Sequence, residues 1–127
     1  MTDSPTAANG VLVVEDEALV RMLVVQAFEE AGFIVHEAGE AKGALEVLRT
    51  VDSIGLMVTD VGLPGMDGRR LADQARTHRP EIRVLFMTGY ADSALVETAL
   101  PKGFGLITKP FDLDDLTSKA QALIGAD

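Results

Sequence analysis

The sequence predicts an α/β fold in which five βα units form a doubly wound three-layer sandwich. Short aliphatic runs alternate with helix-like stretches five times, the runs are apolar at successive positions, and 127 residues suit one domain. Runs without polar alternation are typical of strands in a parallel sheet that helices cover on both faces. Short connections and right-handed crossovers then produce the doubly wound arrangement.

The predicted strands are the aliphatic and partly β-branched runs. They cover residues 11–14, 33–35, 54–58, 84–87 and 104–108. In an open parallel sheet, ligands bind beyond the carboxyl ends of the strands, near the point where the winding direction reverses. The residues that follow each strand are therefore the first candidates for a functional site.

The predicted helices are the stretches between these strands that have helical periodicity. They cover approximately residues 18–31, 41–50, 68–78, 92–100 and 113–124. Glycine or proline near the ends of three of them agrees with these boundaries. Residues 1–9 are polar and are expected to form a disordered tail, so that the domain comprises residues 10–127.

The composition argues against several classes of protein. The chain has 11 Lys and Arg against 20 Asp and Glu, and a net charge of -9 opposes contact with a phosphate backbone, so we do not expect direct DNA binding. The absence of cysteine excludes disulfides and thiolate chemistry. The first residues lack the features of a signal peptide, and no apolar run approaches the roughly 18 residues of a membrane span. The expected location is the cytoplasm, without membrane contact.

Chemically active side chains follow four of the five predicted strands. Glu15 and Asp16 follow the first strand, Asp60 the third, Thr88 the fourth and Lys109 the fifth. Because parallel strands end at the same edge of a sheet, we expect these side chains to converge even though they are distant in sequence.

Three carboxylates, a hydroxyl and an ammonium at one edge suit phosphoryl transfer. Clustered carboxylates raise one another's pKa values unless a cation lies between them. Ligands that are all oxygen atoms favour Mg²⁺, with waters and a phosphate completing its shell. Asp60 would be the nucleophile that forms an aspartyl phosphate, while Lys109 and Thr88 stabilise the phosphoryl oxygens.

Four segments carry a resemblance to a known family. VLVVEDE, TDVGLPGMDG, MTGY and ITKPF, in this order and spacing, resemble the receiver domain of two-component response regulators over nearly the whole chain after the tail. The resemblance implies a flavodoxin-like fold with strand order 2-1-3-4-5 and transfer of phosphate from a phosphohistidine to Asp60. It implies Mg²⁺ bound by Asp16, Asp60 and the Gly62 carbonyl, with Glu15 acting through water or as a secondary ligand. It also implies a cis peptide bond before Pro110.

The same resemblance defines the expected partners and output. A sensor histidine kinase or a histidine phosphotransferase would supply the phosphate, and the chain would catalyse only its own phosphotransfer and autodephosphorylation. If the 127 residues are the whole protein, no output domain follows. The product would then be a protein-protein signal, or the chain would act as a phosphate shuttle or sink.

One departure from the family concerns the switch. Typical receivers carry an aromatic residue three positions before the lysine, where this chain has Leu106. FMTGY is similar to the FATGUY subgroup of receivers, with Met87 in place of the alanine. That similarity implies that Tyr90, together with Thr88, signals to the helix expected at residues 92–100, often in stand-alone receivers that work with HWE-type kinases. Tyr90 could alternatively only cover the site, since an amphipathic ring suits a half-buried loop.

Other functions are disfavoured by particular positions. A haloacid-dehalogenase-like phosphatase needs a second carboxylate two residues after the nucleophile, where Gly62 stands. A nucleotide or flavin module needs a glycine-rich loop after the first strand, where the sequence is EDEAL. A phosphorylation-independent interaction domain would not be expected to retain the whole acceptor set. Asp67 is interpreted as a helix N-cap, and His36 and His78 are given no role.

Overall fold

The computed structural model describes residues 10–89 and 100–125, and its centre is one parallel sheet. The sheet has five strands in the order β2-β1-β3-β4-β5, which is the order predicted. The strands are β1 (Gly10–Val14), β2 (Ile34–Ala38), β3 (Ile54–Asp60), β4 (Arg83–Thr88) and β5 (Phe104–Thr108). The predicted flavodoxin-like α/β fold is therefore confirmed.

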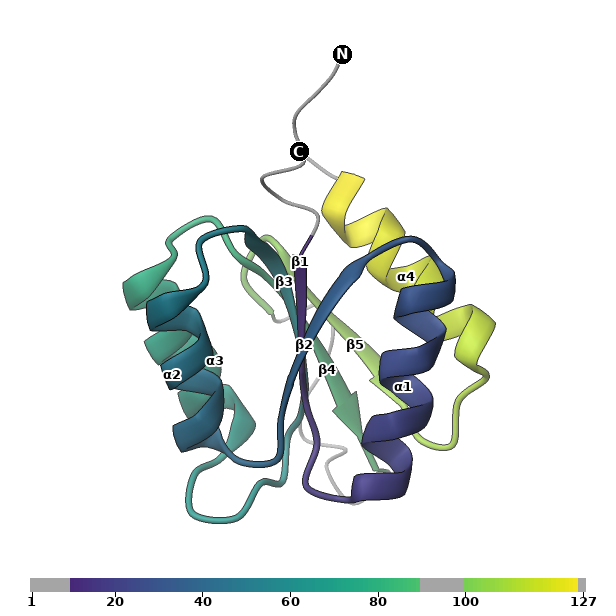
Figure 1. Ribbon diagram of the computed structural model, residues 1–127, viewed down its shortest axis with the longest axis horizontal. Coiled ribbons are helices and arrows are strands. Elements are labelled where there is room, and N and C mark those ends of the chain that lie inside the picture. Colours follow the sequence, from purple (N-terminus) through teal and green to yellow (C-terminus); the bar gives the residue numbers. More distant parts are fainter. Residues whose placement is uncertain (1–9, 90–99, 126–127) are drawn as a thin grey trace.

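Helices cover both faces of the sheet (Figure 1). The described helices are α1 (Ala18–Glu30), α2 (Ala41–Thr50), α3 (Gly68–His78) and α4 (Leu113–Gly125). Figure 1 shows α2 and α3 on one face and α1 and α4 on the other. The helix predicted at residues 92–100 lies outside the described residues, apart from its last position. None of the helices in the described ranges is long and apolar enough to cross a membrane.

The central strand shows why its sequence has no polar alternation. Every residue of β1 is buried, because helices pack on both sides of it. Leu12 and Val14 contribute to the core beneath α2 and α3, whereas Val11 and Val13 contribute to the core beneath α1 and α4. Alternate side chains therefore enter different cores, although all four are aliphatic.

The largest difference from the predicted boundaries is in β2, which continues to Ala38, three residues beyond the predicted end. This strand lies at an edge of the sheet, where Ile34 and Glu37 are exposed. An edge strand tolerates polar side chains, so its apolar pattern ends before the strand does. The other predicted boundaries differ from the observed ones by one or two residues at an end, or not at all.

Candidate functional site

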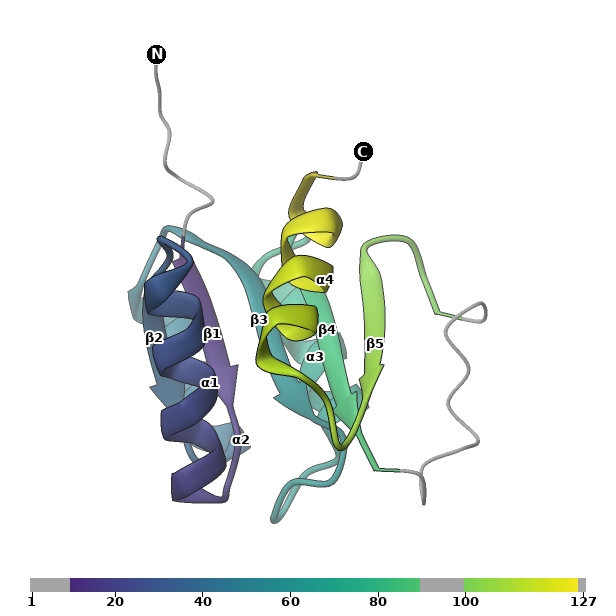
Figure 2. The same cartoon turned by 90° about the vertical axis from the view of Figure 1, so that its right-hand side faces the viewer.

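The candidate site lies where the strands end, at the lower edge of the sheet in Figures 1 and 2. Backbone hydrogen bonds continue the pairing of the strands into this edge. The Glu15 N–H donates to the Ala38 carbonyl at 3.1 Å, and the Lys109 N–H donates to the Thr88 carbonyl at 2.6 Å. The order of the sheet places β1 beside β3, where the winding direction reverses. The site therefore occupies the position at which doubly wound folds bind ligands.

Three carboxylates meet at this edge. One oxygen atom from each of Glu15, Asp16 and Asp60 lies within 4.8 Å of the other two. Glu15 is buried, Asp60 is half-buried and Asp16 is exposed, so the group opens from the interior to the solvent. The donor atoms are all carboxylate oxygens, close enough for one ion to contact all three, and such a set fits a hard divalent cation.

Lys109 supplies the positive charge beside these carboxylates. Its Nζ atom donates to Glu15 Oε1 at 3.2 Å and to Asp60 Oδ2 at 3.1 Å. Burial alone would lower the pKa of Lys109, but the hydrogen bond and charge of Asp60, followed by those of Glu15, outweigh burial and raise it. The ammonium therefore remains charged at neutral pH and draws the two carboxylates together.

The Glu15 carboxyl group is held in an unfavourable environment for its charge. Its side chain is fully buried, and this burial raises its pKa. The Glu17 N–H, which donates to Oε2 at 3.1 Å, and the charge of Lys109 oppose the rise, while the charge of Asp60 adds to it. A further cation at this edge would stabilise the charged form of Glu15.

The aspartates near helix starts have different roles. Asp67 caps α3, because its side chain accepts a hydrogen bond from the Arg69 N–H at 2.7 Å, and this confirms the predicted N-cap. The N-cap position of α1 is Glu17, which makes no side-chain capping bond. Asp16 precedes that position and is not the cap, so its carboxylate stands beside Glu15 and Asp60 instead.

The start of α3 packs closely against the end of β3. The Gly68 N–H donates to the Val61 carbonyl at 2.6 Å. A β-carbon at Gly68 would lie 2.2 Å from the Asp60 carbonyl oxygen, which is too close for any side chain. Gly68 therefore lets α3 approach the backbone of Asp60, while Gly62 lies in the loop between them.

The residues expected at the switch lie partly within the described chain. The side chain of Thr88 is buried, and Leu106 packs against the core formed with α2 and α3. Tyr90 lies outside the described residues. The Lys109-Pro110 peptide bond is cis, as the family resemblance implies.

The sequence analysis missed one residue that contacts the site. Arg21, in the first part of α1, donates to the Glu15 carbonyl oxygen at 2.7 Å and to Glu37 Oε1 at 2.9 Å. A lone arginine on a helix gives no sign that its guanidinium reaches across to two strands. The signal available was its position one turn into the helix, four residues after Glu17, which ends the acidic segment that follows β1.

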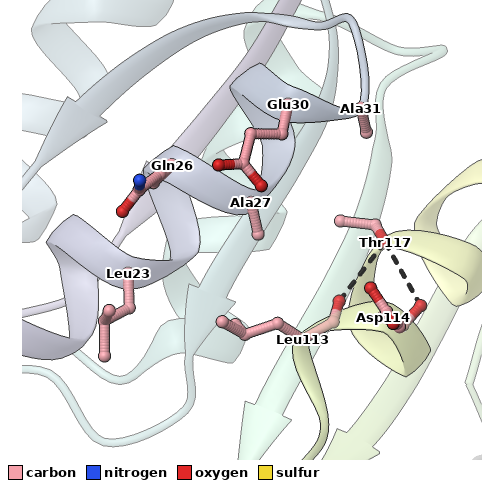
Figure 3. A pocket seen from close by; sticks show the side chains of 8 residues that line it. All are labelled: Leu23, Gln26, Ala27, Glu30, Ala31, Leu113, Asp114 and Thr117. Carbon is pink, nitrogen blue, oxygen red and sulfur yellow. Dashed lines mark hydrogen bonds between the residues drawn. The ribbon is translucent and has the colours of Figure 1, made fainter.

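The outer surface of α1 is apolar beside the site. Leu19, Met22 and Leu23 are 65%, 55% and 41% exposed. Leu23 also lines a groove of about 550 Å³ between α1 and α4, where it and neighbouring helix side chains face Leu113 and Thr117 (Figure 3). Clustered exposed apolar side chains are typical of a surface that contacts another protein.

Comparisons with known proteins agree with this geometry. The sequence profile of the response regulator receiver domain matches residues 11–121. The sensor kinase CckA of Brucella abortus (strain 2308) is 38% identical over 117 residues, which are 90% of this chain but only 12% of CckA. The response regulator receiver protein CpdR of the same organism is 32% identical over 115 residues, covering 90% of this chain and 95% of CpdR. A crystal structure of a response regulator receiver protein from Sinorhizobium medicae WSM419 has a TM-score of 0.84 at 26% identity, covering 94% of this chain and 96% of the other.

Proposed function

Because this chain belongs to the response regulator receiver domain family, we propose that Asp60 is the aspartate that accepts the phosphoryl group in two-component signalling. Receiver domains receive phosphate from histidine kinases or histidine phosphotransferases. The observation that carries the proposal is the position of the Asp60 carboxylate, 3.1 Å from Lys109 Nζ and within 4.8 Å of two further carboxylates. We assign residues 10–127 to the receiver domain and residues 1–9 to a polar tail.

In the proposed reaction, a carboxylate oxygen of Asp60 attacks the phosphorus of a phosphohistidine. The new O–P bond forms as the N–P bond breaks, and the imidazole leaves with the electron pair of the broken bond. The Lys109 ammonium and the Thr88 hydroxyl donate to the phosphoryl oxygens. Beyond this transfer and the later hydrolysis of its own aspartyl phosphate, we propose no catalytic activity for the chain.

The proposed cofactor is Mg²⁺, and the carboxylate cluster supports it. Asp16, Asp60 and the Gly62 carbonyl would hold the ion, with Glu15 as a secondary ligand or acting through water. When bound, Mg²⁺ would supply positive charge that neutralises the carboxylates and the phosphoryl oxygens that approach them. Among the described residues, the three carboxylates of the site share the ammonium of Lys109, which pairs with Glu15 and Asp60.

The function is tested with a small phosphodonor. Incubation with acetyl phosphate and Mg²⁺ should add one phosphoryl group to the intact mass of the protein, and EDTA should prevent the addition, because the carboxylates then repel the donor. Hydroxylamine should remove the group, since it cleaves an acyl phosphate but not a phosphate ester of serine or threonine. Equal incorporation with EDTA, or a product that resists hydroxylamine, would reject the proposal.

We propose a sensor histidine kinase of the HWE type, or a histidine phosphotransferase, as the phosphodonor, with the transfer occurring in the cytoplasm. The exposed apolar side chains of α1 support contact with a protein donor beside the site. The net charge of -9 supports output through protein contacts rather than direct DNA binding.

We further propose that the chain belongs to the FATGUY subgroup and that Thr88 and Tyr90 form its switch, since β5 carries Leu106 in place of an aromatic residue. Addition of beryllofluoride, which mimics the phosphoryl group, should shift the amide resonances of residues 92–100 and of β5 in the wild type. Tyr90→Ala should lose these shifts, because the ring that couples Thr88 to this surface is gone. Identical shifts in Tyr90→Ala and wild type would assign Tyr90 to packing and place the switch elsewhere.

A further inference from the structure

Arg21 connects three elements at the edge of the candidate site. Its guanidinium donates from Nη1 to the Glu15 carbonyl oxygen at 2.7 Å and from Nε to Glu37 Oε1 at 2.9 Å. The side chain is 23% exposed, so most of it is withdrawn from water. It therefore joins the first turn of α1 to the residue that follows β1 and to the edge strand β2.

These contacts complete the set of bonds that orient Glu15. Its N–H donates to the Ala38 carbonyl, and its carboxylate accepts hydrogen bonds from the Glu17 N–H and Lys109 Nζ. The Glu15 carbonyl belongs to the peptide unit that leads into Asp16. Because that unit is planar, fixing the carbonyl oxygen also fixes the direction in which the backbone of Asp16 departs.

We propose that Arg21 is a positioning residue for the metal ligands of this site. Through the Glu15 carbonyl it holds the peptide unit between Glu15 and Asp16, so that both carboxylates face Asp60. The Glu37 carboxylate holds the guanidinium from the side of β2. Gly39 leaves space for the guanidinium, since a β-carbon at this position would lie 3.1 Å from Arg21 Nη1. The inference rests on the proposed Mg²⁺ site and adds a residue that does not touch the ion.

An electrostatic role and a positioning role for Arg21 predict opposite changes in Mg²⁺ affinity when Arg21 is replaced. Loss of a cation near a site for a divalent cation would by itself strengthen Mg²⁺ binding, because one source of repulsion disappears. Loss of the bond that fixes the ligand-bearing peptide would weaken binding, since the ligands are no longer held in place. The sign of the change therefore distinguishes a positioning role from a purely electrostatic one.

The experiment is a titration with Mg²⁺ alone, followed through the amide resonances of residues 15–17 and 60–62. In Arg21→Met, which keeps an unbranched side chain but no charge, we expect Mg²⁺ affinity to fall about 10-fold, the usual scale for loss of a partner that orients a metal ligand. We also expect faster hydrogen exchange at the Glu17 N–H, because it donates to the carboxylate of Glu15. Arg21→Lys should weaken binding less, since a lysine retains the charge but lacks the forked geometry that reaches two acceptors.

The matched control is Arg49→Met. Arg49 also pairs with a glutamate, Glu46, at 2.6 Å, but both lie on the exposed face of α2. This variant should keep wild-type Mg²⁺ affinity and wild-type exchange at Glu17. Asp16→Asn removes a proposed ligand, so its loss of Mg²⁺ affinity shows how large the effect is when direct coordination is lost.

Mg²⁺ affinity that is unchanged or higher in Arg21→Met would overturn the positioning role. If Arg21→Met does not fold, Arg21→Lys decides: wild-type affinity together with wild-type Glu17 exchange would overturn the role. Failure of the proposed Mg²⁺ site has a different signature, namely a wild-type protein without Mg²⁺-dependent shifts or an Asp16→Asn variant with undiminished affinity. Either result would remove the basis of the inference as well.

Discussion

Asp60→Asn should reduce phosphate incorporation from acetyl phosphate to below about 1% of the wild-type level, because the amide oxygen that replaces the carboxylate is not a nucleophile. The substitution keeps the shape of the side chain and an oxygen that can accept a hydrogen bond from Lys109. Intact-mass spectrometry in the presence of Mg²⁺ measures the result directly. Incorporation equal to that of the wild type would show that another residue is the acceptor.

The same variant should remain folded. Burial is the main cause of the raised pKa of Glu15, and replacing Asp60 removes the negative charge that adds to it, while Lys109 keeps its hydrogen bond to Glu15. Loss of the attraction between Lys109 and Asp60 destabilises the fold, whereas loss of the repulsion between Asp60 and Glu15 stabilises it. Because these effects oppose each other, we expect the free energy of unfolding to stay within about 1 kcal/mol of the wild type. Asp73→Asn, on the exposed side of α3, is the matched control and should be phosphorylated normally.

The sequence predicted the layers of the fold better than the limits of its edge strand. Unbroken apolar runs are typical of strands that are covered on both faces, so β1 and β3 could be predicted from their local sequences. In β2, the chain faces solvent at Ile34 and Glu37, and the apolar pattern stops while the hydrogen-bonded pairing with β1 continues to Ala38. Pairing of this kind depends on the neighbouring strand, which a local pattern does not reveal.

The candidate site was predictable to the extent that it depends on topology. Once the strands are parallel, the residues at or just beyond the ends of β1, β3, β4 and β5 must meet at one edge. The structure brings Glu15, Asp16, Asp60 and Lys109 together there. The contact between Arg21 and Glu15 was not predictable in this way. It requires a long flexible side chain on a helix to fold back over the preceding strand end, and many rotamers of an arginine would point elsewhere.

Lys109→Met should slow phosphorylation by acetyl phosphate about 100-fold or more, which is the usual effect of removing one donor to the oxygens of a transition state. The lysine is the cation that contacts both Glu15 and Asp60 among the described residues. Initial rates at saturating Mg²⁺ measure the loss. A rate within about threefold of the wild type would show that the ammonium does not act on the phosphoryl oxygens. Lys42→Met, an exposed lysine on α2, is the control and should leave the rate unchanged.

The effect of Lys109→Met on stability should depend on pH in a direction that follows from the two raised pKa values. The pKa of Lys109 is raised in the folded protein, so its charge stabilises the fold below the ordinary lysine pKa of 10.5, and this contribution is lost as the pH rises through the folded value. At neutral pH the variant leaves the buried Glu15 carboxylate without its cation, and we expect a loss of about 1–3 kcal/mol in the free energy of unfolding. At lower pH, the free energies of unfolding of the variant and the wild type should become more similar. The reason is that the buried Glu15 carboxyl, whose pKa is raised, stabilises the fold when it becomes protonated. Urea denaturation of both proteins at pH 5, 7 and 10.5 without Mg²⁺ measures the difference, and a deficit that is larger at pH 5 than at pH 7 would contradict the assignment of the buried charge to Glu15.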